Sequence, residues 1–142
     1  MHETSIEEGL EPVLAKDARY HRDAYLFVRD ALDFTKTTFA DRRKSLQATE
    51  QLHVTGQELL AGIRTYALTQ YGPMTMTVLE EWGVTRCEDF GEIVFNMVDA
   101  GLLSKTDSDS RDDFHGGYSF EQAFRNPFLP QSKLPKDIKS VI

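Results

Sequence analysis

Two segments of the form T-x-x-E are each followed by an amphipathic stretch that ends at a glycine. These segments are TGQE at residues 55–58 and TRCE at residues 85–88. In such a capping box, the threonine hydroxyl and the glutamate carboxylate accept hydrogen bonds from free amide groups at the start of a helix. A glycine just past the last apolar position favours a helix end, because it tolerates a left-handed backbone. The pattern predicts one helix that stops at Gly72 and another that stops at Gly101.

Two more helices are predicted from the spacing of apolar residues. Between residues 23 and 39, apolar side chains recur at the spacing of one helix face, which indicates a buried N-terminal helix. Pro73 suits the first turn of a short helix that ends near Trp82, because the amide hydrogen that proline lacks is not needed there.

Other segments show no such spacing. Residues 1–16 are acidic and polar, and we expect a flexible arm with Leu10, Val13 and Leu14 as docking points. Residues 40–53 are dominated by polar side chains and are expected to connect the first helix to the rest of the fold, with His53-Val54 as a very short strand. The connector also holds the basic cluster Arg42, Arg43 and Lys44.

The segment after Gly101 predicts a small β-hairpin. Leu102-Leu103 and the segment Tyr118-Ser119-Phe120, with its two aromatic residues, flank a polar loop, which is typical of two short strands. Residues 121–142 hold three prolines, so we expect an extended tail that packs Phe124, Phe128 and Leu129 on the body. The fold class expected is mainly α with a small β-hairpin (α+β).

The loop of this hairpin is rich in carboxylates, which raises the question of a calcium site. Calcium-binding loops of the EF-hand type need a glycine at the sixth position and a bidentate glutamate at the twelfth. Here Arg111 occupies the fifth position, Asp112 the sixth and Tyr118 the twelfth. A solvated hairpin tip is therefore favoured over a metal site.

The predicted elements follow the order of a winged helix, with a helix at 59–71, a helix at 74–82, a helix at 85–100 in the recognition position, and a hairpin. The segment VLEEWGVTRCEDFGEIVFNMVDAGLL resembles winged helix-turn-helix domains of bacterial regulators. This resemblance covers residues 54–120 and implies a winged-helix-like core. The expected organisation is one domain, with 1–16 as arm, 17–53 as N-terminal helix and connector, and 121–142 as tail.

A second resemblance covers residues 17–130. Through DAYLFVRDALDFT, HVTGQELLAGIRTYALTQYGPM, LEEWGV, EDFGEIVFNMVDAGLLSKT and YSFEQAF, the chain resembles a bacterial family of uncharacterised proteins, a domain-of-unknown-function family. That resemblance implies no activity, substrate or site.

Charge argues against the customary function of a winged helix. The formal charge is −7, and residues 78–113 hold ten acidic side chains against three basic ones. Affinity for nucleic acid comes largely from Lys and Arg that displace counterions from phosphates. Nucleic-acid binding is therefore kept as the disfavoured alternative, with Arg42, Arg43 and Lys44 as its one basic patch.

The same helix offers a candidate face for a protein partner. On the side opposite the expected core, an aromatic ring is surrounded by carboxylates, which suits a partner of basic or mixed charge. The alternative is that the N-terminal helix covers this ring inside the fold. We expect a non-catalytic protein–protein interaction module whose partner is another protein or a second copy of the chain. The candidate face comprises Glu88, Glu92, Phe95, Asn96 and Asp99.

No catalytic, metal or cofactor motif is found, and a small enzyme is the least favoured class. The histidines His2, His21, His53 and His115 are far apart in sequence. Cys87 is expected in the first turn of a helix, where the helix dipole can lower a thiol pKa, although a structural cysteine is the commoner case.

The location expected for the chain is the cytoplasm, without contact to a membrane. No run approaches the roughly 20 apolar residues of a membrane span, and the N-terminus lacks the basic and apolar regions of a signal peptide. The single cysteine fits a reducing compartment.

Overall fold

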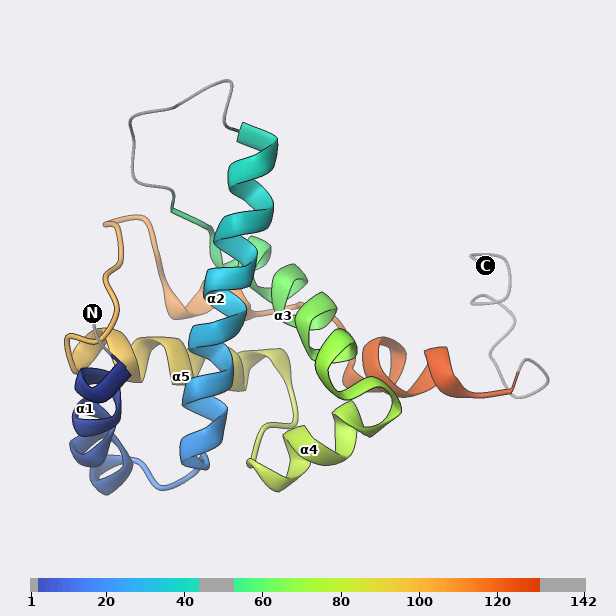
Figure 1. The fold of residues 1–142 in the computed structure, drawn as a ribbon, viewed down its shortest axis with the longest axis horizontal. Helices are drawn as coiled ribbons and strands as arrows, with labels where there is room; N and C mark the ends of the chain where they lie inside the picture. Colours follow the sequence, from blue (N-terminus) through green and yellow to red (C-terminus); the bar gives the residue numbers. More distant parts are fainter. Residues whose placement is uncertain (1–2, 44–52, 131–142) are drawn as a thin grey trace.

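The computed structural model describes residues 3–43 and 53–130, and its regular structure in these residues is helical throughout (Figure 1). The longer helices are α1 (Glu3–Lys16), α2 (Arg22–Arg43), α3 (Gly56–Tyr71), α4 (Thr75–Glu81) and α5 (Cys87–Asp99). The short helical turns are η1 (Gly72–Met74), η2 (Arg111–Phe114), η3 (Glu121–Arg125) and η4 (Asn126–Phe128), of which η3 is a π-helical turn and the others are 3-10 turns.

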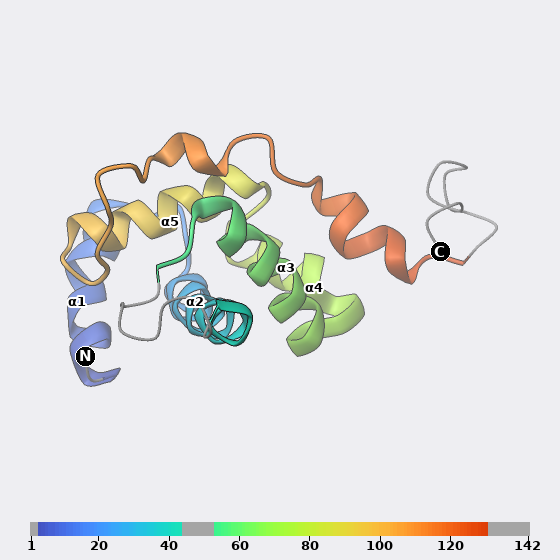
Figure 2. The same ribbon diagram turned by 90° about the horizontal axis from the view of Figure 1, so that it is seen from above.

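Helix α5 lies in the middle of the molecule. Helices α1 and α2 contact it on one side, and η2 contacts it on the other. Figure 2 shows this layering, with α2 seen almost end-on below α5 and the orange η2 above it. Phe90, Ile93 and Met97 of α5 are each at most 1% exposed. The central helix is therefore covered on more than one of its faces.

Helices α2 and α3 approach each other closely at Gly62. A methyl group at Gly62 would overlap the side chain of Thr35, which is fully buried and donates its hydroxyl hydrogen to the carbonyl of Ala31 at 2.7 Å. Glycine inside a helix costs roughly 1 kcal/mol relative to alanine. The close packing of α2 on α3 gives a physical reason for this glycine.

The predicted caps are confirmed for α3 and shifted for α5. At α3, Thr55 Oγ1 accepts a hydrogen bond from the Glu58 amide at 3.1 Å, and Glu58 accepts one from the Thr55 amide at 2.9 Å. At α5, Asp89 and not Glu88 takes the capping role, because its Oδ2 accepts the amide hydrogens of Thr85 at 2.9 Å and Arg86 at 3.2 Å. The helix therefore begins at Cys87, whereas a cap at Thr85 would have placed its start one residue earlier.

The prediction of a loose N-terminal arm was wrong, because residues 3–16 form α1. Ile6, Leu10 and Val13 are 8%, 0% and 5% exposed, and they follow the i, i+4, i+7 spacing of one helix face. Leu10 and Val13 dock on the core as expected, and Leu14 is half-buried.

The α+β fold class, its β-hairpin and the winged-helix-like core were also wrong. Within residues 53–130 there is no strand at 53–54, 102–103 or 118–120. The amide of Leu102 donates instead to the carbonyl of Met97 at 2.8 Å, which continues the end of α5, and η2 occupies the expected loop. Without strands there is no wing, and α5 does not stand free in the recognition position.

The expected tail is helical where the structure describes it, since η3 and η4 span residues 121–128. Phe124 is buried as expected, Leu129 is half-buried, and Phe128 is 45% exposed. The predicted N-terminal helix is confirmed as α2, and it extends into the expected connector as far as Arg43. Lys44, most of the connector and the rest of the tail fall outside the described residues.

Replacing Gly62 with alanine should lower the free energy of unfolding by about 1–3 kcal/mol, since the added methyl group overpacks the contact with Thr35. This loss should appear despite the better helix propensity of alanine. Urea unfolding of Gly62→Ala measures it. The control is Thr65→Ala at an exposed position of the same helix, for which we expect a change within about 0.5 kcal/mol. Equal stability of the two variants would contradict the close approach.

Candidate functional site

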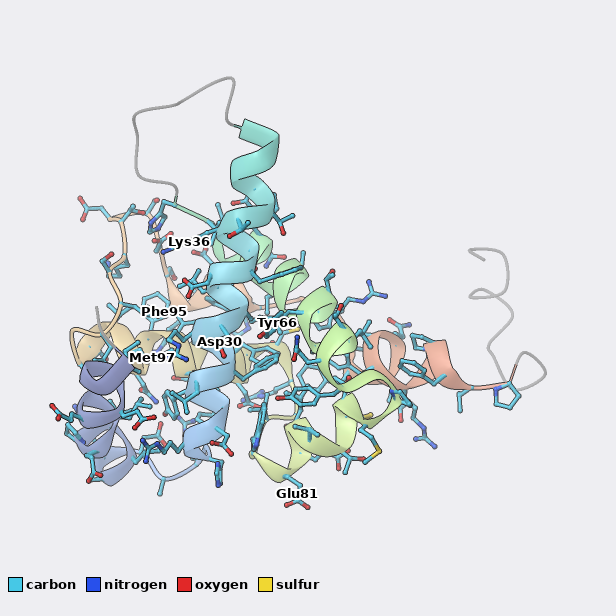
Figure 3. The ribbon with its side chains drawn as sticks, in the orientation of Figure 1. Asp30, Lys36, Tyr66, Glu81, Phe95 and Met97 are labelled. Carbon is cyan, nitrogen blue, oxygen red and sulfur yellow. The ribbon has the colours of Figure 1, made fainter. Side chains whose placement is uncertain are left out.

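The aromatic ring of the candidate interaction face is covered by the fold. Phe95 is 6% exposed, and the guanidinium group of Arg111 lies over its ring at 5.2 Å from the centroid. Figure 3 shows Phe95 beside α2. Phe95 is therefore buried, as in the alternative, but the side chain that lies over its ring is Arg111 of η2 and not one of the N-terminal helix.

Asn96 joins α5 to the start of the chain. Its side-chain amide donates to Asp17 Oδ2 at 2.9 Å and to the Tyr25 hydroxyl at 3.1 Å. Asp17 also accepts hydrogen bonds from Arg19, the shortest at 2.7 Å, and these hold the pKa of the Asp17 carboxyl far below its usual range. Asn96 is thus a tie between elements, and its donors are engaged inside the molecule.

The acidic residues of the candidate face also pair within the chain. Glu92 accepts a hydrogen bond from Arg111 Nε at 3.1 Å, and Glu88 lies 3.3 Å from His115 Nδ1. Asp99, the most exposed of the five, lies 3.7 Å from Arg111 Nη2. The structure brings these residues together with basic side chains of neighbouring loops, so little of the face remains for a basic partner.

A cavity of about 780 Å³ lies next to Phe95, bounded by α1, α2, the start of α3, α5 and the segment 102–114. Its apolar lining comes from several elements and includes Leu32, Leu59, Val94, Phe95, Val98, Leu102 and Leu103. Side chains of both charge signs surround it, namely Arg29, Lys36, Lys105, Asp30, Asp33, Asp109 and Asp113. Asp30, Lys36 and Phe95, labelled in Figure 3, show where it lies along α2 and α5. Sequence analysis did not predict this site, because its lining comes from distant segments.

Polar groups at the edge of the cavity bond to one another. His53 Nε2 lies 2.7 Å from Asp109 Oδ2, which also accepts the Thr106 amide hydrogen at 2.9 Å. Burial raises the pKa of Asp109, but these hydrogen bonds outweigh it and the net pKa is lowered. Arg29 and Asp30 form a further pair at 2.9 Å.

Two of the four carboxylates in the segment 107–113 act as caps. Asp109 caps the turn that starts at Thr106, and Asp113 Oδ2 accepts the amide hydrogen of Ser110 at 3.0 Å at the start of η2. Among the described residues, no group of three or more His, Cys, Asp or Glu side chains is placed to hold a metal ion. Turn formation therefore accounts for Asp109 and Asp113.

Cys87 is a buried thiol at the start of α5. It is 2% exposed, and its Sγ donates to the carbonyl oxygen of Tyr118 at 3.3 Å. Burial raises the pKa of the thiol to about 11, so it stays protonated at neutral pH. The helix dipole does not make this cysteine a nucleophile.

A comparison with protein-family models, with curated proteins and with solved structures finds no match for this chain. The resemblance to a family of uncharacterised bacterial proteins therefore stays a prediction. None of the helices in residues 3–43 and 53–130 is long and apolar enough to cross a membrane.

Replacing Asp17 with asparagine should destabilise the protein at neutral pH by roughly 1–2 kcal/mol, since the charged hydrogen bonds to Arg19 are lost at a partly exposed site. The pKa of Asp17 is lowered in the folded state, so its stabilising effect is full above the unfolded pKa of about 4 and declines as the pH falls below it. Urea unfolding of Asp17→Asn and the parent chain from pH 7 to pH 3 should show the difference shrinking. Glu11→Gln, exposed on α1, is the control. A difference that is constant with pH would contradict the linkage.

The Cys87 thiol should react with a disulfide reagent at pH 8 at least about tenfold more slowly in the folded protein than in urea, because it is buried and protonated. Absorbance of the released thiolate follows the reaction. Equal rates in the two states would mean that the thiol is accessible and ionised in the fold.

Proposed function

We propose that this protein is a non-catalytic protein-interaction module that holds a segment of a partner protein in the cavity between α1, α2 and α5. The observation that supports this function is the make-up of the cavity, which combines an apolar lining with charged side chains of both signs around it. Protein interfaces commonly have an apolar centre and a polar rim.

The state of the polar groups favours a partner segment over a small ligand. Pockets for small molecules usually present a few polar groups that converge on the ligand. Here Asp109 already bonds to His53, and Asp30 bonds to Arg29. Among the described residues, no buried side-chain nitrogen or oxygen lacks a hydrogen-bond partner. Recognition would therefore rest on apolar contacts, with the charges selecting among partners.

The partner expected is a segment with apolar side chains on one face and charges of both signs beside them. Lys36 and Lys105 would suit its carboxylates, and Asp33 would suit its basic groups. This site keeps Phe95 of the candidate face on α5 as part of its lining, whereas the acidic residues of that face lie outside the cavity and pair within the chain.

A photo-crosslinking amino acid at Ser104, which is exposed and lines the cavity, should capture a partner protein in cells. Val98→Glu should reduce this product roughly tenfold or more, because it places an unpaired carboxylate in the apolar lining. Mass spectrometry identifies the product, and its yield on a gel gives the loss.

The matched control is Thr77→Glu, which adds the same charge to an exposed position of α4 outside the cavity. It should leave the crosslink unchanged, and circular dichroism checks that both variants are folded. Identical products from crosslinkers at Ser104 and at Thr77, or a yield that Val98→Glu does not lower, would overturn the proposal.

A further inference from the structure

A smaller hollow of about 260 Å³ lies beside α2, where the helix faces the ends of α3 and α4. Aromatic rings form much of its lining, and they come from segments far apart in sequence: Phe27, Tyr66, Tyr71 and Trp82. Tyr66, labelled in Figure 3, lies in the space between α2 and α3. The proposed partner cavity is a separate site, with which this hollow shares Asp30 alone among its lining residues.

The four rings form one cluster around Phe27. Its centroid lies 5.6 Å from that of Tyr66, 6.0 Å from that of Tyr71 and 5.5 Å from that of Trp82. Tyr71 and Trp82 meet edge to face, with ring planes at 82°. Phe27 is 5% exposed, while the other three rings are half-buried. Phe27 therefore holds together three rings that remain partly open to solvent.

Two carboxylates stand next to these rings. Asp23 and Asp30 both come from α2 and line the same hollow. Asp30 accepts hydrogen bonds from Arg29 through Oδ1, the shorter at 2.9 Å. Asp23 lies 3.6 Å from His21. Burial raises the pKa of Tyr71, and the negative charges of Asp23 and Asp30 add to this shift.

We propose that this hollow is a binding site for an alkylated ammonium group. The face of an aromatic ring carries negative charge density and attracts cations, and carboxylates nearby add to that attraction. Bare ammonium ions are compact and strongly hydrated, whereas a methylated ammonium is less so and presents methyl groups that pack on rings. A small hollow with aromatic walls and two carboxylates suits this chemistry.

The chain carries its own reporter for the test, because Trp82 is its single tryptophan and lines the hollow. Titration of the full chain with tetramethylammonium chloride should give a saturable change in tryptophan fluorescence. Sodium chloride at the same ionic strength should give none. A response that is linear in tetramethylammonium, or equal for sodium, would overturn the proposal.

Substitutions separate the charge and ring contributions. Asp23→Asn should weaken tetramethylammonium binding roughly fivefold, and Asp33→Asn, which removes the same charge from α2 outside this hollow, should leave it unchanged. Tyr66→Leu should abolish saturable binding while keeping an apolar side chain in the wall. Thermal unfolding confirms that each variant is folded. Equal affinities for the two aspartate variants would contradict the assigned site.

Matched ligands distinguish a small-molecule ammonium group from one on a protein side chain. Choline should bind, and dimethylbutanol, its uncharged carbon analogue, should bind at least roughly tenfold more weakly. A peptide with trimethyllysine, compared with its unmodified form, tests a protein side chain as ligand. If the trimethyllysine peptide binds more tightly than choline, the ligand is a protein side chain; if choline binds more tightly, it is a small molecule. Equal binding of choline and dimethylbutanol would contradict the proposal. These binding measurements are independent of the proposed partner cavity, so failure of the crosslink at Ser104 would leave the ammonium-binding result unchanged.

Discussion

The fold depends on the burial of α5 from two sides. Helices α1 and α2 cover one side, and η2 covers the other, so that Gly91 has to leave room for Phe114. A methyl group at Gly91 would lie 2.9 Å from the Phe114 Cβ. The side chains of Phe90, Ile93 and Met97 on this helix are buried between these elements. The arrangement of the outer elements follows from the need to cover it.

Asp89 secures the start of this central helix. It is 8% exposed, and it accepts a hydrogen bond from the Tyr20 hydroxyl at 2.6 Å in addition to the amides of Thr85 and Arg86. A buried carboxylate is costly unless several donors surround it. Because these donors come from the α1–α2 link and the α4–α5 turn, Asp89 joins three parts of the chain. It also sets the helix start at Cys87, which the T-x-x-E pattern alone did not give.

The sequence predicted helices from local signals and failed where tertiary contacts decide. Caps and apolar spacing located α2, α3 and α4, and the i, i+4, i+7 spacing of α1 was hidden by its acidic residues. The hairpin was wrong because apolar pairs such as Leu102-Leu103 fit a strand or a docked loop equally well. The apolar spacing of α5 shows one buried face and cannot show that other elements also pack on the opposite face, so Phe95 was predicted to lie on an open face. The cavity was not predicted because residues such as His53 and Asp109 are far apart in sequence and come together only in the fold.

The charge pattern of the chain acquires another meaning in the structure. Acidic side chains around α5 pair with Arg19 and Arg111, so the excess negative charge there is partly neutralised inside the molecule and is not evidence for a basic partner. Both proposed binding sites lie along α2, which lines the large cavity with Leu32 and the aromatic hollow with Phe27. The helix that apolar spacing predicted as buried is therefore the one that carries the strongest candidates for recognition. The periodicity of apolar residues identified the inward face of α2. Only the packing of α3 and α5 against α2 shows where cavities remain beside it.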